Sequence, residues 1–331
     1  MRLMLESMIQ VAREAAIHRA DTDRDIVAAY LTGSVLDRDP FLGDTADIDL
    51  VLIHAQEPKA RREIVSLAPE IHLDIKHNPR REYSRPRELR LHPWLGPEMY
   101  DPLLLYERDH FFQFVQAGLR DKFHEPVNTL QRSRRNADHA RRICNELQSP
   151  SENGSALVLK YLKAVNHAAN SVAILNGKPL AERRLLLQFP ARAEAADRPG
   201  LTAGLLGLLG APKVDSFALA GFLPEWEKDF QEASSRPNVE KRIHPARFAY
   251  YKKAIESLLG SETPQAILWP FLHTWSLAAS FLPPERQSAW QSACQQLGLI
   301  GDSFKEHLQR LKQYLDDIEA LLEDIASANG I

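Results

Sequence analysis

The fold is decided by the stretch LTGSVLDRDPFLGDTADIDL, residues 31–50. Its end lies in the apolar run DIDLVLI at 47–53, whose composition predicts a strand. Side chains alternate along a strand, so Asp47 and Asp49 share one face while Ile48 enters the core. Two carboxylates on one face of a buried strand repel each other unless a cation joins them. This spacing therefore predicts a cation site.

A third carboxylate follows in a second short apolar run, EIHLDI at 70–75, which contains Asp74. We expect this run to form a strand that pairs beside the first and brings three oxygen ligands together. Carboxylates, waters and substrate phosphates are the ligands that Mg²⁺ prefers. The sequence therefore predicts a magnesium site made by Asp47, Asp49 and Asp74, with Mn²⁺ as an alternative ion.

Gly33 and Ser34 interrupt the first apolar run. DIVAAYLTGS at 25–34 predicts a strand that breaks at Gly33, and VLDRD at 35–39 is suited to open a helix. Backbone N–H groups at a helix start, beside a glycine and a small hydroxyl residue, suit a triphosphate. Gly-Ser alone is more often a turn, and Asp-x-Asp alone is more often a solvated strand end. Their order here, with twelve residues between Ser34 and Asp47, favours a phosphate and metal site.

These residues resemble the signature of the DNA polymerase beta-like nucleotidyltransferase superfamily. That signature is an apolar residue, Gly, then Gly or Ser, a short gap, Asp-x-Asp or Asp-x-Glu, and a third acidic residue in a later strand. DPLLLYERD at 101–109 is also similar to a later strand of the family, so the resemblance covers residues 1–125. The residues that match the signature one for one are Gly33, Ser34, Asp47, Asp49 and Asp74.

The loop from Val35 to Ala46 departs from many members of that superfamily. It holds Asp37, Arg38, Asp39 and Pro40, where antibiotic-modifying relatives often carry a small residue and a glycine. The resemblance therefore implies the superfamily and leaves the antibiotic-modifying subgroup unassigned.

The resemblance implies an enzyme that moves a nucleoside monophosphate from a nucleoside triphosphate, by abundance ATP, to an acceptor hydroxyl or phosphate and releases pyrophosphate. Asp47 and Asp49 would hold the Mg²⁺ that binds the triphosphate. Asp74 would complete a second metal position and lower the pKa of the attacking hydroxyl or accept its proton. Gly33 and Ser34 would bind the leaving phosphates. The expected acceptor is a small molecule, with RNA or protein as alternatives.

Two other functions fit the same residues. One is a nucleotide-binding regulator or antitoxin-like partner that kept the fold and lost turnover. The presence of all three carboxylates argues against it, because a decayed site usually loses one. The other is a nucleotidyltransferase that acts on RNA, which the local basic segments permit and the overall charge balance discourages.

The bulk composition allows two domains with real cores, because the chain has 331 residues and is 44% apolar. A formal net charge of −3 disfavours a uniformly basic nucleic-acid binder. Cys144 and Cys294 have no partners at metal-ligand spacing, which is typical of the reducing cytoplasm. Glu6 and Glu14 in the first apolar run favour an amphipathic helix over a signal peptide. The longest uncharged stretch, 263–284, is interrupted by prolines, so no membrane span is expected.

Strand signals stop after Phe123, which divides the chain into two expected domains. Residues 1–125 predict an α+β catalytic module with a small mixed sheet, flanking helices and a first helix near 5–20. Residues 126–331 predict an all-helical bundle that binds substrate. The expected strands lie near 26–31, 48–53, 70–76 and 103–106. The expected helices of the second domain cover 128–147, 156–175, 179–189, 214–233, 245–259, 266–281, 284–296 and 302–326.

Basic residues offer further candidate phosphate ligands. KHNPRREYSRPRELR at 76–90 begins just beyond Asp74, and RSRRNADHARR at 132–142 opens the helical half, although charge runs are more often solvated faces. Lys160 and Lys163 lie three residues apart on one helical face, from which both could reach a triphosphate. In relatives, a lysine or arginine of the helical domain commonly does this.

The final segment, FKEHLQRLKQYLDDIEALLEDI at 304–325, repeats apolar residues at helical spacing. This pattern predicts a helix that packs in the bundle or against a second copy of the chain. A homodimer through this helix is therefore one expected assembly.

Overall fold

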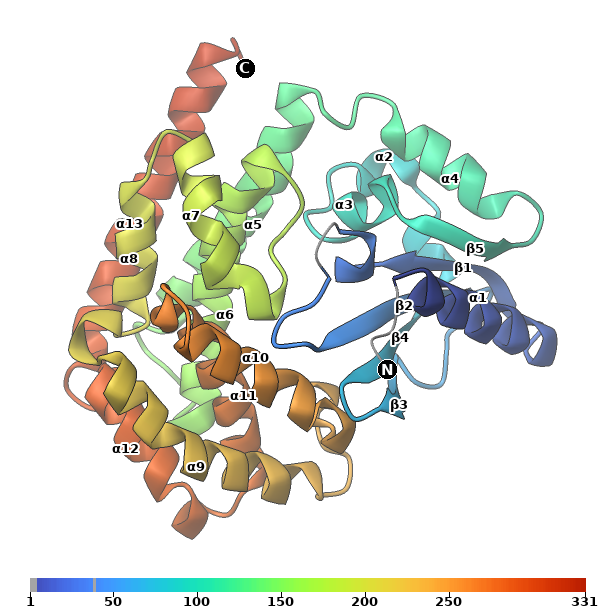
Figure 1. Ribbon diagram of the computed structural model, residues 1–331. Coiled ribbons are helices and arrows are strands. Elements are labelled where there is room, and N and C mark those ends of the chain that lie inside the picture. The colour runs from blue at the N-terminus through green and yellow to red at the C-terminus, as the bar shows by residue number, and fades with distance from the viewer. Residues whose placement is uncertain (1–4, 38–39) are drawn as a thin grey trace. The chain divides into compact units, whose positions relative to one another are not determined.

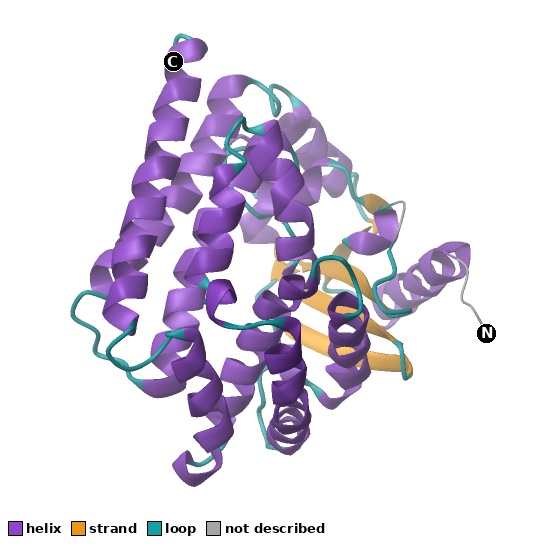
Figure 2. Ribbon diagram, turned by 60° about the vertical axis from the view of Figure 1, so that its left-hand side comes forward, coloured by secondary structure: helices purple, strands orange, loops and turns teal. Residues whose placement is uncertain are grey.

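The computed structural model describes residues 5–37 and 40–331, and over these residues the chain has an α+β fold. The chain divides into two compact units, Met1–Asn128 and Thr129–Ile331. The sequence placed this boundary after residue 125. In the described part of the chain, every strand belongs to one sheet in the first unit, and the second unit is helical (Figures 1 and 2).

A mixed sheet forms the base of the first unit. Its strands are β1 (Ile26–Thr32), β2 (Ala46–His54), β3 (Arg62–Ala68), β4 (Ile71–Pro79) and β5 (Leu103–Glu107). They are ordered β3-β4-β2-β1-β5. β2 and β4 run parallel, and the other neighbouring pairs are antiparallel. The two strands that carry the predicted carboxylates are therefore direct neighbours.

The sequence predicted four of these strands and missed β3. This strand lies at the edge of the sheet and pairs only with β4 among the described strands. Of its seven residues only Ile64 is buried, so the segment REIVSLA lacks the apolar run that marks the central strands. Its polar side chains are tolerated because an edge strand is exposed to solvent.

Helix α1 (Leu5–Thr22) covers one face of the sheet and packs on β1, β2 and β5 (Figure 1). Its buried side chains recur every four residues, which places them on one side of the helix. Three of them are alanines, and their small size lets the helix approach the strands closely. The buried residues are Met8, Ala12, Ala16 and Ala20.

The other face of the sheet packs against a second apolar cluster. Tyr30, Val51 and Ile53 project from the strands into this cluster. The covering elements are α2 (Pro86–Leu89), α3 (Leu95–Tyr100) and α4 (Phe111–Arg120). Because both faces are covered, the central strands read as the continuous apolar runs seen in the sequence.

The second unit consists of helices joined by short turns. The expected helices all have counterparts, although α7 begins at Leu185 rather than at residue 179 because a 3₁₀ turn occupies Glu182–Arg184. The helices are α5 (Pro126–Glu146), α6 (Gly154–Ala173), α7 (Leu185–Ala195), α8 (Gly200–Leu208), α9 (Ser216–Ser234), α10 (Phe248–Leu259), α11 (Leu268–Phe281), α12 (Ser288–Leu297) and α13 (Phe304–Ala328).

Helix α8 was not predicted, because its three glycines lower the helix propensity of the segment. The structure gives Gly204 a packing role. A Cβ atom at this position would lie 2.9 Å from the ring of Tyr314 on α13, so the glycine allows the two helices to approach closely. Contact with α13 therefore outweighs the weak local preference.

The apolar residues of α13 pack inside the unit, against α6 and α8 of the same chain. Leu311, Leu315 and Ile318 are fully buried there. Homodimer formation through this helix stays a prediction.

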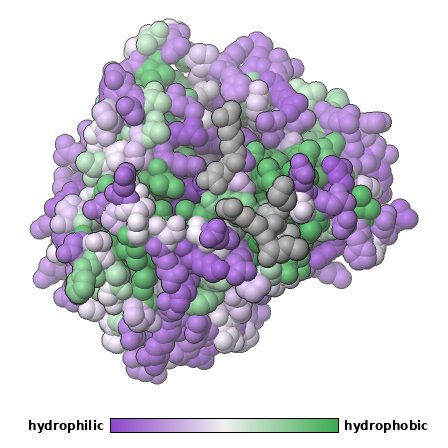
Figure 3. Space-filling model, in the orientation of Figure 1, coloured by the Kyte–Doolittle hydropathy of each residue, from purple (hydrophilic) through white to green (hydrophobic). Residues whose placement is uncertain are grey.

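The face shown in Figure 3 mixes hydrophilic and hydrophobic side chains. Phe114 and Phe217 are the most exposed large apolar side chains, and they belong to different units. None of the helices in the described part of the chain combines the length and hydropathy that a membrane crossing needs.

Candidate metal centre

Gly33 and Asp49 lie in direct contact at the end of β1. Thr32, the last residue of β1, pairs with Asp49 on β2, and Gly33 follows with φ +78°. A Cβ atom on Gly33 would lie 1.9 Å from Asp49 Oδ2. Any other residue would therefore collide with the carboxylate, in a backbone conformation that glycine adopts most readily. The structure thus brings the predicted Gly33-Ser34 turn against a predicted metal ligand.

The three predicted carboxylates converge on one face of the sheet. Asp47 and Asp49 alternate with buried Ile48 on β2, and the parallel register places Asp74 of β4 directly opposite Asp49. Each residue offers one ligand atom, and these atoms all lie within 4.8 Å of one another. Asp47 and Asp74 are buried, whereas Asp49 is half-buried. This group could hold a metal ion.

The Gly33-Ser34 turn continues into a short 3₁₀ helix, Ser34–Leu36, instead of the longer helix that VLDRD suggested. The Ser34 Oγ atom is buried and has no hydrogen-bond partner in the described part of the chain. Arg38 and Asp39, which marked the departure from relatives, lie outside the described residues. Ser34 therefore has a buried hydroxyl directly after the glycine that contacts Asp49, without a helix terminus behind it.

Arg62 binds the third carboxylate from the edge strand β3. Its Nε donates to Asp74 Oδ1 at 2.7 Å, and one terminal nitrogen donates to Asp74 Oδ2 at 2.5 Å. Asp74 is fully buried, so this two-bond pair replaces solvent around its charge. Sequence reasoning missed Arg62 because it missed β3.

Lys76 lies two residues after Asp74 on the same face of β4, and it is half-buried. Its Nζ donates to Glu98 Oε2 at 2.9 Å. Burial lowers the pKa of Lys76, but the charges of Glu98, Asp49 and Asp74 outweigh burial and raise it. Glu98 also accepts from the buried Tyr30 hydroxyl at 2.8 Å. A fixed positive charge therefore stands beside the carboxylates.

His72 is fully buried two residues before Asp74, and it pairs with Asp47 in the register of β2 and β4. Sequence reasoning missed His72, and it included Lys76 only as the first residue of the basic segment 76–90. The signal was available, since strand periodicity places residues 72, 74 and 76 on one face.

The two lysines that the sequence nominated in the helical unit have different surroundings. Lys160 Nζ lies 3.1 Å from Glu152 and 3.2 Å from Glu146. Lys163 is exposed near the histidines His139 and His167, whose pKa it helps to lower. Whether either lysine contacts a nucleotide stays a prediction.

The basic segments are mostly engaged with the protein itself. In 76–90, Arg81 pairs with Glu57, and Arg90 donates to the carbonyl oxygens of Gly118 and Leu119. In 132–142, Arg141 binds Asp316 and Glu319 on α13. These arginines have packing and pairing roles within their units.

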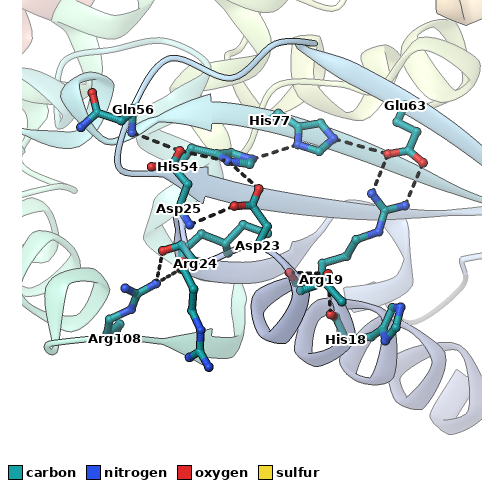
Figure 4. Close-up of polar contacts among 12 residues, drawn as sticks. His18, Arg19, Asp23, Arg24, Asp25, His54, Gln56, Glu63, His77 and Arg108 are labelled. Atoms are coloured by element: carbon teal, nitrogen blue, oxygen red, sulfur yellow. Dashed lines mark hydrogen bonds and ion pairs between the residues drawn. The ribbon is translucent and has the colours of Figure 1, made fainter.

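A second polar cluster lies on the opposite face of β2 and β4 (Figure 4). His54 follows Asp49 by five residues and His77 follows Asp74 by three, and these odd steps reverse the side-chain direction. His54 Nε2 and His77 Nδ1 lie 3.0 Å apart. His77 Nε2 lies 3.6 Å from Glu63, which accepts two 2.8 Å hydrogen bonds from Arg19.

In the described part of the chain, Asp47, Asp49 and Asp74 are the one group of potential ligands that converge closely enough for a metal ion. Their donor atoms are all carboxylate oxygens, which suit a hard divalent cation such as Mg²⁺ or Mn²⁺. No protein-family model matches this chain, and no curated protein matches it.

Proposed function

We propose that the protein is a metal-dependent nucleotidyltransferase that uses a nucleoside triphosphate, with ATP as the default donor. The observation that carries the proposal is the convergence of Asp47, Asp49 and Asp74 beside the Gly33-Ser34 turn. The carboxylates suit the metal ion. The Ser34 hydroxyl, which follows Gly33 and has no hydrogen-bond partner in the described part of the chain, is a candidate ligand for the phosphates of such a substrate. The sequence resemblance to nucleotidyltransferases supports the same reading of the sheet and its flanking helices.

The reaction joins an acceptor oxygen to the α-phosphorus and breaks the bond to the bridging oxygen. Pyrophosphate leaves with the electron pair of the broken bond, and the acceptor hydroxyl gives its proton to solvent water. When bound to these carboxylates, Mg²⁺ would neutralise the negative charge of the phosphates and lower the pKa of the attacking hydroxyl. Asp47 and Asp49 on β2 would hold the metal ion that binds the triphosphate, and Asp74 on β4 would complete a second metal position at the attacking hydroxyl.

The contact with Arg62 distinguishes between two roles of Asp74, metal ligand and proton acceptor. A guanidinium that donates to both carboxylate oxygens stabilises the ionised carboxylate. An ionised carboxylate oxygen can accept more than one contact, so the pair with Arg62 is compatible with a role of Asp74 as a metal ligand. Asp74 is therefore better suited to hold a metal ion than to take up the proton, and Arg62 fixes its orientation.

The test is a transfer assay with each of the four nucleoside triphosphates, labelled at the α-phosphate, in the presence of Mg²⁺. Acceptor pools of small hydroxyl compounds such as aminoglycosides, of tRNA and of protein are scored for label. The Asp49→Asn variant is the matched control. Label transfer and pyrophosphate release that both disappear in the variant support the proposal, whereas Mg²⁺-dependent nucleotide binding without either product supports the catalytically silent alternative.

A further inference from the structure

A cluster of nitrogen-bearing side chains lies in the helical unit, where α5 meets α6. Asn136 and His139 come from α5, three residues apart and thus on the same side of the helix. The Asn136 Oδ1 atom accepts a hydrogen bond from Nδ1 of His167 on α6 at 3.1 Å, and the ring centroids of His139 and His167 lie 4.2 Å apart. Asn136 is 1% exposed, whereas both histidines are half-buried. The cluster therefore reaches from the core of the unit toward its surface.

The tautomer of His139 follows from its neighbour Arg142. A terminal guanidinium nitrogen of Arg142 lies 2.9 Å from His139 Nδ1. A guanidinium only donates, so Nδ1 must accept, and the neutral ring carries its proton on Nε2. That Nε2 atom is buried and has no hydrogen-bond partner among residues 5–37 and 40–331. His139 therefore presents a buried N–H donor without an acceptor.

Asn136 presents a second donor of this kind. Its Oδ1 is engaged by His167, and its Nδ2 is buried without a hydrogen-bond partner in the described structure. Unsatisfied buried donors cost stability, and native proteins hold few of them. Two in one cluster point to a ligand that brings acceptor atoms.

The surroundings of these donors are positively charged. Arg142 and Lys163 are exposed, and neither pairs with a carboxylate of the described residues. Burial, together with the charges of Lys163 and Arg142, lowers the pKa of His139, which Glu146 opposes. Burial, His139 and the same two cations lower the pKa of His167 to about 4. A negatively charged ligand would relieve this repulsion.

We propose that Asn136, His139, Arg142, Lys163 and His167, here called the α5–α6 patch, bind a phosphate group. Phosphate oxygens accept several hydrogen bonds, so one phosphate satisfies both buried donors while its charge offsets the two exposed cations. A metal cation would meet donors and like charge, and an apolar ligand would leave both donors unsatisfied. Phosphate binding itself does not depend on the proposed transferase activity. The biological source of the phosphate, either the donor triphosphate or a phosphorylated acceptor, does rest on it.

The test follows the ring C–H resonances of the histidines by NMR, with His139→Gln and His167→Gln used for assignment. Inorganic phosphate and inorganic tripolyphosphate are added to the full chain without divalent metal. We expect saturable shifts of the His139 and His167 resonances, and no shift of His54 or His77 in the first unit. Unshifted His139 and His167 resonances with both anions would overturn the proposal.

Variants separate this site from general surface charge. His139→Phe keeps an aromatic ring but removes the N–H donor, and Lys163→Met removes a charge at an exposed position. Each should weaken the phosphate response of His167 about tenfold or more, the usual effect of losing a charged hydrogen bond. Lys160→Met is the matched control, since Glu146 and Glu152 already pair with Lys160. Equal weakening by Lys160→Met and Lys163→Met would reduce the effect to nonspecific charge and defeat the proposal.

His139→Phe also distinguishes binding from a structural role. Removing an unsatisfied buried donor should leave the melting temperature unchanged or higher, although phosphate binding is lost. A variant that loses both stability and binding would instead make His139 a structural residue. Asp49→Asn, which should abolish transfer, is expected to keep the phosphate response of His167, so the two proposals fail separately.

A competition experiment between an ATP analogue and phosphate identifies the source of the phosphate. If the donor nucleotide occupies the patch, a non-hydrolysable ATP analogue with Mg²⁺ shifts the His139 and His167 resonances and prevents a further response to phosphate. If the acceptor carries the phosphate, the analogue leaves both resonances in place, and a phosphate monoester still shifts them. Either result supports the site, whereas a response to neither ligand argues against it.

Discussion

Strands β2 and β4 carry a polar cluster on each face, and the two clusters differ in the charges that they bring together. On one face, Asp47, Asp49 and Asp74 bring three like charges within 4.8 Å. On the other face, His54 and His77 contact each other at 3.0 Å, and Glu63 binds Arg19 through two hydrogen bonds (Figure 4). The first cluster gathers three carboxylates at one point, whereas the second contains an ion pair between Glu63 and Arg19 beside two histidines in contact.

This difference in charge predicts different roles for the two faces of β2 and β4, one in function and the other in stability. Converging carboxylates destabilise a folded protein unless cations join them, and the chain places Arg62 and Lys76 there as fixed partners. A paired cluster such as Arg19–Glu63 holds the sheet together without an external ligand. We therefore expect substitutions on the carboxylate face to change metal binding and turnover, and substitutions on the histidine face to change stability alone.

The largest effect is expected for Asp47→Asn and Asp49→Asn, which should abolish nucleotidyl transfer. Each removes a metal ligand and also removes like-charge repulsion, so the metal-free variants should melt at the same temperature as the wild type or higher. Turnover and thermal melting, measured on the same samples, check both parts. Retention of more than about a tenth of wild-type turnover, equivalent to ~1.4 kcal/mol of barrier, would contradict the metal assignment.

Asp74→Asn should separate catalysis from nucleotide binding. Turnover should fall by roughly a hundredfold or more, because the position that activates the nucleophile is lost, while affinity for Mg-ATP stays near that of the wild type. Unlike the first two variants, this one also breaks a buried ion pair with Arg62 and should lower the melting temperature. Calorimetric titration with a non-hydrolysable ATP analogue, beside a pyrophosphate-release assay, measures both. Loss of both binding and turnover would contradict the assignment of nucleotide binding to the carboxylates of β2 and of nucleophile activation to Asp74 on β4.

Nucleotide binding should depend on the metal. A nucleoside triphosphate should raise the melting temperature only with Mg²⁺ or Mn²⁺ present, because the carboxylates repel an uncomplexed triphosphate. At 100 times its dissociation constant the ligand adds about 2.7 kcal/mol of stability. The paired measurement is ATP with Mg²⁺ against ATP with EDTA, and equal shifts would count against a metal centre on this face.

Glu63→Gln, on the face that carries His54 and His77, should lower the free energy of unfolding without changing metal binding by the carboxylates. It removes the charge of the Glu63 carboxylate and one of the two hydrogen bonds from Arg19. Because both side chains are partly exposed, the expected loss of unfolding free energy is about 0.2–1 kcal/mol. Urea unfolding measures the loss, with Glu57→Gln as a control at another exposed, ion-paired carboxylate of the same unit. A change in the Mg²⁺ dependence of melting would show that the two faces are coupled.

The carboxylate face was readable from the sequence, because strand periodicity alone places Asp47, Asp49 and Asp74 together once β2 and β4 are neighbours. The same periodicity indicates Lys76. Arg62 was not readable, since β3 is an edge strand and its pairing with β4 comes from the tertiary fold. The phosphate-binding role of the Gly33-Ser34 turn remains a prediction.

The helical unit shows a second limit of sequence reasoning. Lys160 and Lys163 look equivalent in the sequence, three residues apart on one helix. Their surroundings differ because other segments of the chain pack beside them. Glu146 and Glu152 pair with Lys160, whereas His139 lies near Lys163. The unsatisfied donors of Asn136 and His139 likewise exist only after α5 and α6 have packed.

The smallest expected effect concerns pH and the histidine face. Burial, together with His54, lowers the pKa of His77, although Glu63 opposes this. As the pH falls below about 6.5, the unfolded chain therefore takes up a proton at this residue before the folded chain does, and stability is lost toward the folded pKa. His77→Gln removes this contribution, so the wild type should lose stability relative to the variant between about pH 7.5 and 5.5. The other histidines with lowered pKa cancel in the comparison, because both proteins carry them.

Urea unfolding at several pH values measures the difference in stability between the wild type and His77→Gln. Parallel curves would mean that neither burial nor His54 disfavours protonation of His77. Since His77 faces away from Asp74, the Mg²⁺ dependence of melting should be the same in both proteins.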